Sequence, residues 1–327
     1  MIAWLLACGG TAPGTDGDTP TGRVPEGALL GSQVRAEADG VWVSAPGVEG
    51  DGVVARLDRL SGDATLADAS VVMRASEPGQ VGGPFAVCDW DSGQAVAVGA
   101  PELGDRGRAW LVADPGPGET AIGAQPYAEN RQDGAHTGSS VTCAPDLLLV
   151  GAPDTAAAAA GSGTVDVYVP GESGPDKIAN VDTAFGGAHL GLRTGVLPGV
   201  DWDGDGTEDL VVGAPGSARA HVLPGPIQGS VLASAAGYVL QGEDGGELGY
   251  ALATGDLDGD GALDLVLGEP GAGNGKGRLW VVRGPIDADH EGLLRNLAVS
   301  VGGVTQGAKL GFSLAVVGDV DVDGRDD

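Results

Sequence analysis

The sequence predicts an all-β protein made of repeated units of short strands. Apolar runs of about four residues alternate with turn residues, and no stretch shows the 3.6-residue period of an amphipathic helix. The 61 glycines and 20 prolines among 327 residues recur in a regular pattern. Hydrophobic residues make up 42% of the chain, which is enough to bury a core. Aromatic residues contribute only 4%, so small aliphatic side chains must fill that core.

A Gly-Ala-Pro tripeptide marks the repeat. It occurs at Gly99–Pro101, Gly151–Pro153 and Gly213–Pro215, with weaker copies at Ser44–Pro46 and Gly268–Pro270. The prolines of successive copies lie 52 to 62 residues apart. A period of roughly 50–60 residues built from short strands is typical of a propeller or a similar array.

Each copy follows the same order of elements. A pair ending in glycine opens it, and a short apolar strand, a turn and a buried strand then lead into Gly-Ala-Pro. A third strand carries a ring side chain, and a less regular stretch supplies the fourth, so the sequence predicts blades of four strands. The opening pairs are Leu30-Gly31, Gly82-Gly83, Thr137-Gly138, Leu190-Gly191, Leu248-Gly249 and Leu310-Gly311. The buried strands are 95–98, 147–150, 210–212 and 265–267, the ring residues Trp110, Tyr168, His221 and Trp280, and the fourth strands 238–240 and 297–301.

Three copies carry the pattern Asp-x-Asp-x-Asp-Gly-x-x-Asp, at 201–209, 256–264 and 319–327. Carboxylates this close repel one another, and a hard divalent cation that takes oxygen ligands removes the repulsion. Glycine at position six permits the sharp turn, position seven offers a backbone carbonyl, and position nine closes the shell. The predicted ligands are Asp201, Asp203, Asp205, Thr207 and Asp209; Asp256, Asp258, Asp260, Ala262 and Asp264; and Asp319, Asp321, Asp323, Arg325 and Asp327.

The alternative for each acidic stretch is a solvated Asp-Gly turn. Recurrence at one place in three copies favours about three Ca²⁺ sites instead. Mg²⁺ fits less well, because it prefers rigid octahedral sites and keeps its waters. The earlier copies have only the shortened Asp89-Trp90-Asp91 and ordinary turns at 37–40 and 144–146.

These motifs resemble the FG-GAP repeat of integrin α-chain propellers and their bacterial relatives. The acidic stretches match the first nine positions of an EF-hand loop but lack its Glu at position twelve, as the β-hairpin calcium loop of that family does. The resemblance covers residues 30–327, although the Phe-Gly of the family is mostly Leu-Gly here. It implies a seven-bladed propeller, of which this chain holds about five and a half blades. We therefore interpret the chain as a C-terminally truncated fragment.

Composition and motifs exclude several classes of function. With 17 Lys and Arg against 46 Asp and Glu, the net charge is −29, which excludes a nucleic-acid binder. No apolar run is long enough for a membrane helix. Gly271–Gly277 lacks the spacing of a phosphate-binding loop. The histidines at 136, 189, 221 and 290 show no metal-ligand spacing, and we expect them in the core or at the rim. The sequence contains no catalytic motif.

The resemblance therefore implies a non-enzymatic binding or adhesion module with an unidentified protein or glycan ligand. Contact is expected through loops on the face opposite the acidic hairpins, at 47–52, 102–107, 154–163, 216–218 and 271–277. Two alternatives stay open: an accessory propeller of a larger enzyme whose catalytic domain lies outside this chain, and a structural surface protein.

The N-terminus resembles a bacterial lipobox. Residues 1–8 are apolar and end on Leu-Leu-Ala-Cys, which predicts a lipoprotein signal segment with lipidation of Cys8, although the usual positive charges are missing. The alternative is an ordinary apolar N-terminus. Residues 9–27 predict a flexible tether, and 28–327 the propeller. The expected location is extracytoplasmic, either in a bacterial envelope through the lipid anchor or secreted.

Cys88 and Cys143 occupy equivalent places in neighbouring copies, each five residues after its opening glycine. In a propeller these first strands line the axis, where adjacent blades come closest. An exported protein meets oxidising conditions, so the pair is expected to form a disulfide or to remain as two small buried thiols.

Overall fold

The computed structural model describes residues 33–37, 40–45, 52–58, 68–75, 81, 83–90, 93–122, 126–128, 132–144, 146–156, 159–171, 174–184, 186–192, 196–233, 237–286 and 292–327. Within them the structure is all-β apart from short helical turns. The signal segment 1–8 with Cys8, the tether 9–27, the pair Leu30-Gly31 and nearly all of loop 47–52 lie outside the described residues. No helix of the described part is both long and apolar enough to cross a membrane.

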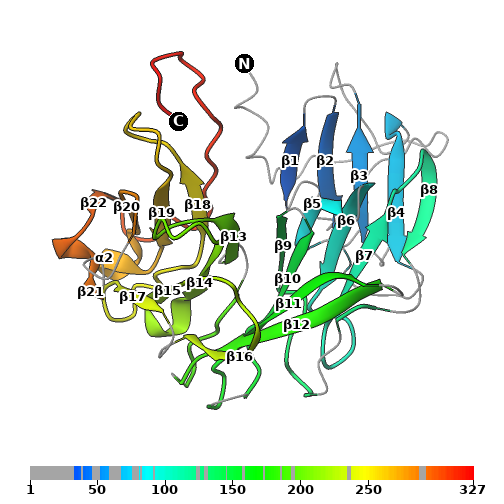
Figure 1. Ribbon diagram of the computed structural model, residues 1–327, viewed down its shortest axis with the longest axis horizontal. Helices are drawn as coiled ribbons and strands as arrows, with labels where there is room; N and C mark the ends of the chain where they lie inside the picture. The colour runs from blue at the N-terminus through cyan, green and yellow to red at the C-terminus, as the bar shows by residue number, and fades with distance from the viewer. Residues whose placement is uncertain are drawn as a thin grey trace, which may run out of the picture.

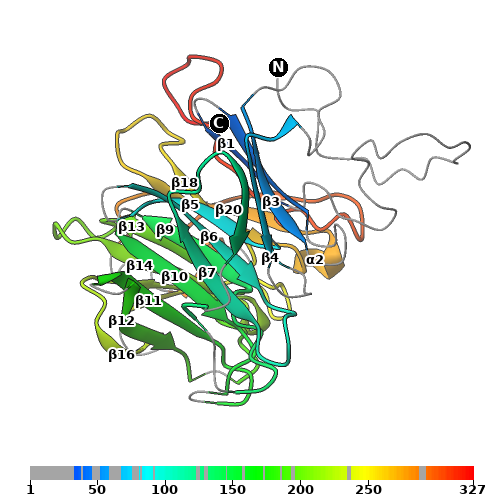
Figure 2. The ribbon, with the colours of Figure 1, turned by 90° about the vertical axis from the view of Figure 1, so that its right-hand side faces the viewer.

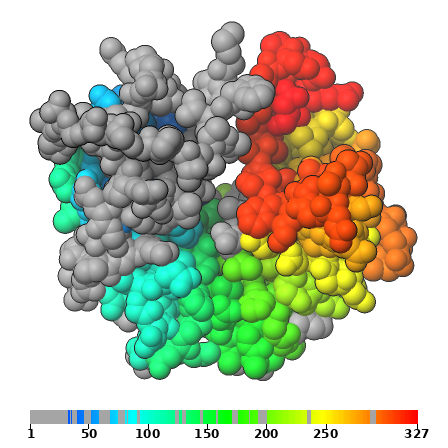
Figure 3. Space-filling model, turned by 180° about the vertical axis from the view of Figure 1, so that it is seen from behind, coloured from blue at the N-terminus to red at the C-terminus, as the bar shows by residue number. Residues whose placement is uncertain are grey.

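Five sheets follow one another along the chain, and the colours of Figures 1 and 3 run round the molecule in the same order. The first holds β1 (Val34–Glu37), β2 (Gly40–Ala45), β3 (Val53–Leu57), β4 (Val71–Ala75) and β8 (Gly118–Ile122), and the second β5 (Phe85–Trp90), β6 (Gly93–Ala100) and β7 (Arg108–Ala113). The third holds β9 (Ser140–Ala144), β10 (Leu147–Ala152), β11 (Thr164–Gly171), β12 (Gly174–Asp182) and β16 (Gly229–Leu232). The fourth holds β13 (Val196–Val200), β14 (Asp209–Ala214), β15 (Arg219–Leu223), β17 (Tyr238–Gln241) and β21 (Gly292–Leu293), and the fifth β18 (Leu252–Gly255), β19 (Asp264–Glu269), β20 (Arg278–Val282) and β22 (Val299–Gly302).

In the fourth and fifth repeats the second strand is the most deeply buried one. All residues of β14 and of β19 are buried, because each strand has an antiparallel neighbour on both sides and a sheet packed on its faces. A strand buried on both faces reads as a continuous apolar run rather than an alternating one. The buried strands predicted at 95–98, 147–150, 210–212 and 265–267 are confirmed as parts of β6, β10, β14 and β19.

The glycine of Gly-Ala-Pro lies against the opening glycine of the following repeat. A Cβ atom on Gly99 would meet the carbonyl oxygen of Gly138 at 2.1 Å, and one on Gly213 would meet that of Gly249 at 2.0 Å. The opening glycine has positive φ, 86° at Gly138 and 83° at Gly249, which other residues rarely adopt. Both glycines of the repeat are therefore required by backbone contact between neighbouring sheets.

The core lies between consecutive sheets. One cluster joins Val211, Val222 and Leu240 of the fourth sheet to Leu265 and Trp280 of the fifth. The ring residues predicted on the third strands are confirmed there and are buried: Trp110, Tyr168, His221 and Trp280.

Three sheets contain a strand that the sequence did not predict. The segment between the third and fourth strands of one repeat pairs in parallel with the outermost strand of the preceding repeat, as β8 does with β4, β16 with β12 and β21 with β17. Each added strand begins with a glycine of positive φ: Gly118, Gly229 and Gly292. Two further differences concern the fourth strands. The last fourth strand begins at Val299 instead of 297, after a 3₁₀ turn at Leu294–Asn296. In the second sheet a single β-bridge between Ala109 and Ala128 takes the place of a fourth strand among the described residues.

A disulfide joins Cys88 of β5 to Cys143 of β9, with a Cα–Cα distance of 5.7 Å. The two strands are the first strands of neighbouring repeats, and Cys88 is 3% exposed. The covalent link therefore fastens the second sheet to the third at their first strands.

Thiol counting on denatured, unreduced Cys8→Ser protein tests this link. We expect no free thiol, and we expect the added Cys88→Ala and Cys143→Ala changes to lower the free energy of unfolding by about 4 kcal/mol, since the closed loop spans 55 residues. Two free thiols per chain would contradict the bridge.

His221 gives a pH-dependent prediction. Burial, with a smaller contribution from the charge of Arg219, lowers its pKa to about 4 from an ordinary 6.5. The unfolded chain therefore binds more protons between these values, so the stability contributed by neutral His221 is present above pH 6.5 and is lost as the pH falls towards 4. Relative to His221→Phe, the wild type should lose about 3 kcal/mol between pH 7.5 and 4. Urea unfolding of both proteins measures this loss of stability. If the stability of the two proteins changed with pH in the same way, His221 would not contribute to the pH dependence.

Candidate metal centre

Three acidic loops recur along the C-terminal part of the chain. The first, 201–209, joins β13 to β14, and the second, 256–264, joins β18 to β19. The third, 319–327, is the last part of the chain. The first two lie at the start of the second strands β14 and β19, so the loops that follow Gly213–Pro215 and Gly268–Pro270 lie at the opposite end of those strands.

The first aspartate of each loop organises the turn. In the first loop Asp201 accepts hydrogen bonds from the amides of Gly204, Asp205 and Gly206 at 2.8, 3.0 and 2.9 Å. Asp256 accepts the equivalent three bonds in the second loop, and Asp319 accepts those from positions five and six in the third. The glycine at position six has φ near 90° in all three loops, as a turn of this shape requires.

The ninth position anchors the first and second loops to their sheets. Asp209 Oδ2 accepts the amide of Trp202 at 2.7 Å, and its Oδ1 accepts that of Gly225 at 2.8 Å, beyond the third strand. Asp264 makes the same two contacts, with Leu257 and Gly284. Both carboxyl groups are almost fully buried, and that burial raises the pKa of each. Sequence reasoning missed this anchoring role, although the Gly-Pro pairs at 225–226 and 284–285 were a signal for it.

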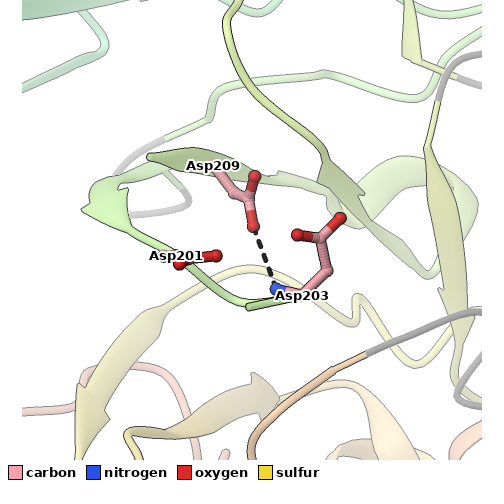
Figure 4. A group of neighbouring side chains, drawn as sticks. All are labelled: Asp201, Asp203 and Asp209. Carbon is pink, nitrogen blue, oxygen red and sulfur yellow. Dashed lines mark hydrogen bonds between the residues drawn. The ribbon is translucent and has the colours of Figure 1, made fainter. Parts of the chain in front are cut away.

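Three carboxylates converge in each loop, with ligand atoms within 4.8 Å of one another. The groups are Asp201, Asp203 and Asp209 (Figure 4), then Asp256, Asp258 and Asp260, and finally Asp319, Asp321 and Asp327. Every donor is an oxygen atom, which suits a hard divalent cation. The residues therefore fit such a cation, and the second group is built from positions one, three and five rather than nine.

The remaining predicted ligands are used differently. Asp205 Oδ1 accepts the amide of Thr207 at 2.8 Å and also its hydroxyl hydrogen bond, and these bonds lower the pKa of Asp205. Asp323 accepts the amide of Arg325 at 3.0 Å, and Asp260 that of Ala262 at 2.8 Å. The role of Thr207, Ala262 and Arg325 as carbonyl donors stays a prediction.

The loops differ in two details. Arg283 lies 3.2 Å from Asp258 Oδ2, so the second group is partly neutralised by a cationic side chain. Position four is Gly204 or Gly259 in the first two loops, both with φ of 78°, but Val322 in the third, with φ of 63°. A β-branched residue is strained in this left-handed conformation.

Two histidines that appeared isolated in sequence share one carboxylate on the opposite side. His136 Nδ1 lies 2.6 Å from Asp154 Oδ2, and His189 Nδ1 lies 2.7 Å from Asp154 Oδ1. Asp154 directly follows a Gly-Ala-Pro, so the three side chains fasten predicted partner loop 154–163 to the turns that open the third and fourth repeats. Another predicted partner loop, 271–277, contains the short turn α2 (Ala272–Gly275) between two strands, which is not the setting of a phosphate-binding helix.

Comparison with known proteins supports the repeat that the sequence predicts. Residues 248–282, which contain the second acidic loop, match the FG-GAP repeat family. The chain is 32% identical over 165 residues to integrin alpha-V of Gallus gallus, covering 46% of this chain and 15% of that protein. It is 33% identical over 157 residues to integrin alpha pat-2 of Caenorhabditis briggsae (40% and 12%) and 42% identical over 71 residues to integrin alpha-PS2 of Drosophila melanogaster (21% and 5%).

The chain thus spans less than a fifth of the length of these curated relatives. The chain contains an FG-GAP repeat at 248–282 and is similar to integrin α chains.

Proposed function

We propose that the chain is a calcium-stabilised FG-GAP β-propeller that acts as a non-enzymatic binding or adhesion module outside the cytoplasm. The observation that carries the proposal is the repetition of one oxygen-lined loop at equivalent places in three repeats. Each loop brings three carboxylates within 4.8 Å of one another. A single acidic turn would not by itself indicate a metal site.

Calcium is the cation that suits these loops best. Ca²⁺ accepts six to eight oxygen ligands in flexible geometry, whereas Mg²⁺ demands a near-ideal octahedron. The convergent groups are irregular, since they use positions one, three and nine in two loops and one, three and five in the other. When bound, the ion supplies positive charge that offsets carboxylate repulsion within the loop. The side chains of Asp201, Asp256 and Asp319 are already held by backbone amides and would lose little freedom on binding.

The arrangement of the sheets supports the propeller. Consecutive sheets contact one another through first strands and glycine backbones, and the chain order follows the order in space (Figure 3). With the opening pair and acidic loop of a sixth repeat, we infer about five and a half blades of a seven-bladed ring. A bacterial origin belongs to the same proposal.

Partner binding is assigned to the face opposite the acidic loops. Its loops vary between repeats, while the strands that carry them do not. A protein or glycan ligand and an adhesion role rest on the similarity to integrin α chains, since a fold does not fix a function. An extracytoplasmic location with a lipid anchor at Cys8 completes the proposal. The alternatives are an accessory propeller of a larger enzyme whose catalytic domain lies outside this chain, and a structural surface protein.

Removal of calcium tests the metal sites. A ligand that binds only the folded state adds about 2.7 kcal/mol of stability per site at a hundred times Kd. Excess chelator should therefore lower the Tm, and Asp203→Ala combined with Asp258→Ala should reproduce most of the loss. Glu102→Ala with Asp244→Ala removes the same charge from exposed positions outside the loops and serves as the matched control. A melting curve that chelator leaves unchanged would refute structural calcium.

The strained valine gives a second, reciprocal test. Val322→Gly should strengthen calcium binding at the third loop several-fold, because it removes a left-handed valine that costs roughly 1–2 kcal/mol. Gly204→Val should weaken the first loop, although a Cβ there meets nothing within 4 Å. Calcium titration followed at the amides of Gly324 and Gly206 reports each loop. Equal affinities before and after both changes would show that position four does not shape the site.

A further inference from the structure

The second and third acidic loops lie side by side. In Figures 1 and 2 the yellow hairpin between β18 and β19 and the red C-terminal loop occupy the same end of the molecule. Their main chains are joined at Asp326, which stands at position eight of the third loop. Its Oδ2 accepts the amide of Asp256 at 2.9 Å, and its own amide donates to the Asp256 carbonyl oxygen at 2.8 Å.

Small residues make this approach possible. A Cβ atom on Gly255 would lie 2.8 Å from Asp326 Oδ2, and one on Gly259 would lie 3.1 Å from the carbonyl oxygen of Gly324. Asp326 is half-buried, whereas every other residue of the third loop is exposed. The contact is therefore packed on both sides and is not a loose surface bond.

Each end of the link leads directly to a predicted ligand. On one side Asp256 is the first position of the second loop and holds the amides of Gly259, Asp260 and Gly261. On the other side the next residue, Asp327, belongs to the convergent group of the third loop and accepts the amide of Val320 at 3.1 Å. One residue thus connects the first ligand of one loop to the last ligand of the next.

Position eight differs in the other two loops. It is Glu208 in the first loop and Leu263 in the second, and both side chains are exposed. Leucine offers no acceptor for a neighbouring amide. The link between the two loops is thus made by the third loop, at a position whose side chain differs from one loop to the next.

We propose that Asp326 is a positioning residue that couples the second and third loops, so that calcium bound at either one strengthens binding at the other. This inference rests on the proposed function. A cation that fixes Asp327 also fixes Asp326 and with it the main chain of Asp256, so the ordering of the second loop is partly accomplished before its own ion arrives. Coupling of this kind is reciprocal, and it typically changes affinity about 5- to 150-fold.

The amides at position six allow each loop to be followed separately. Gly206, Gly261 and Gly324 donate to the first aspartate of their own loops at 2.9, 2.9 and 2.8 Å. Calcium titration of the isotope-labelled full chain, observed by NMR at these three amides, gives three midpoints. In Asp326→Ala we expect the midpoints of Gly261 and Gly324 to rise at least about 5-fold and that of Gly206 to stay unchanged.

Two further variants separate coupling from charge. Asp326→Asn keeps an acceptor oxygen but removes the charge, so it should retain much of the coupling. Glu208→Ala removes a charge from the same position of the first loop and should leave Gly261 and Gly324 unaffected. The unchanged Gly206 titration also shows that each variant is folded.

A double-mutant cycle decides the matter. Asp321→Ala disables the third loop and should weaken the Gly261 site in the wild-type background but not in the Asp326→Ala background. An equal loss in both backgrounds, or an unchanged Gly261 midpoint in Asp326→Ala, overturns the coupling and leaves calcium binding intact. A titration that moves none of the three amides overturns calcium binding itself, and the coupling with it.

Discussion

The contact on which the structure depends is the close approach of two glycine backbones at each junction between repeats. The glycine of Gly-Ala-Pro meets the opening glycine of the next repeat at Gly99–Gly138, Gly151–Gly191, Gly213–Gly249 and Gly268–Gly311, where a Cβ atom would lie 2.0 to 2.2 Å from a carbonyl oxygen. The opening glycine also donates its amide within its own repeat, as Gly191 does to Gly213 at 3.0 Å. Neighbouring sheets are thus held together by main chain, and a side chain at either position would force them apart.

This constraint places the two ends of each second strand in different settings. At its end, the fixed glycine contact leaves the following loop free to vary, from the helical turn Pro215–Ser217 to the longer segment around Asp154. At their start, β14 and β19 begin on a buried aspartate whose two oxygens accept main-chain amides on both sides of the hairpin. The acidic loops are therefore rigid where they meet the sheet and exposed where their carboxylates converge. That division suits a site that captures a cation and transmits its effect to the fold.

The fifth repeat shows how much a local substitution can alter this scheme. Glu269 replaces the alanine of Gly-Ala-Pro and is fully buried, with Oε2 accepting the indole N–H of Trp280 at 2.7 Å. Its Oε1 accepts the amide of Glu243, and glycines at 242 and 246 leave room for it. Burial raises the pKa of Glu269, whereas the bond from the Gly273 amide, followed by the pairing with Arg278, lowers that of Glu243. The carboxylate thereby ties the connection from the fourth sheet to the core of the fifth.

The sequence alone determined the repeat, the buried strands, the ring residues and the three acidic loops, because each depends on residues within one short stretch: an apolar run, a turn glycine, or aspartates at alternate positions. It also placed Cys88 and Cys143 at equivalent positions, while leaving their bonding open. Tertiary structure decided everything that joins one repeat to another: the added parallel strands β8, β16 and β21, the shared carboxylate of Asp154, and the contact of Asp326 with Asp256. It also decided which oxygens converge, with Asp260 rather than Asp264 in the second loop. These contacts depend on how whole sheets pack, and residues far apart in sequence carry no local pattern that reveals such packing.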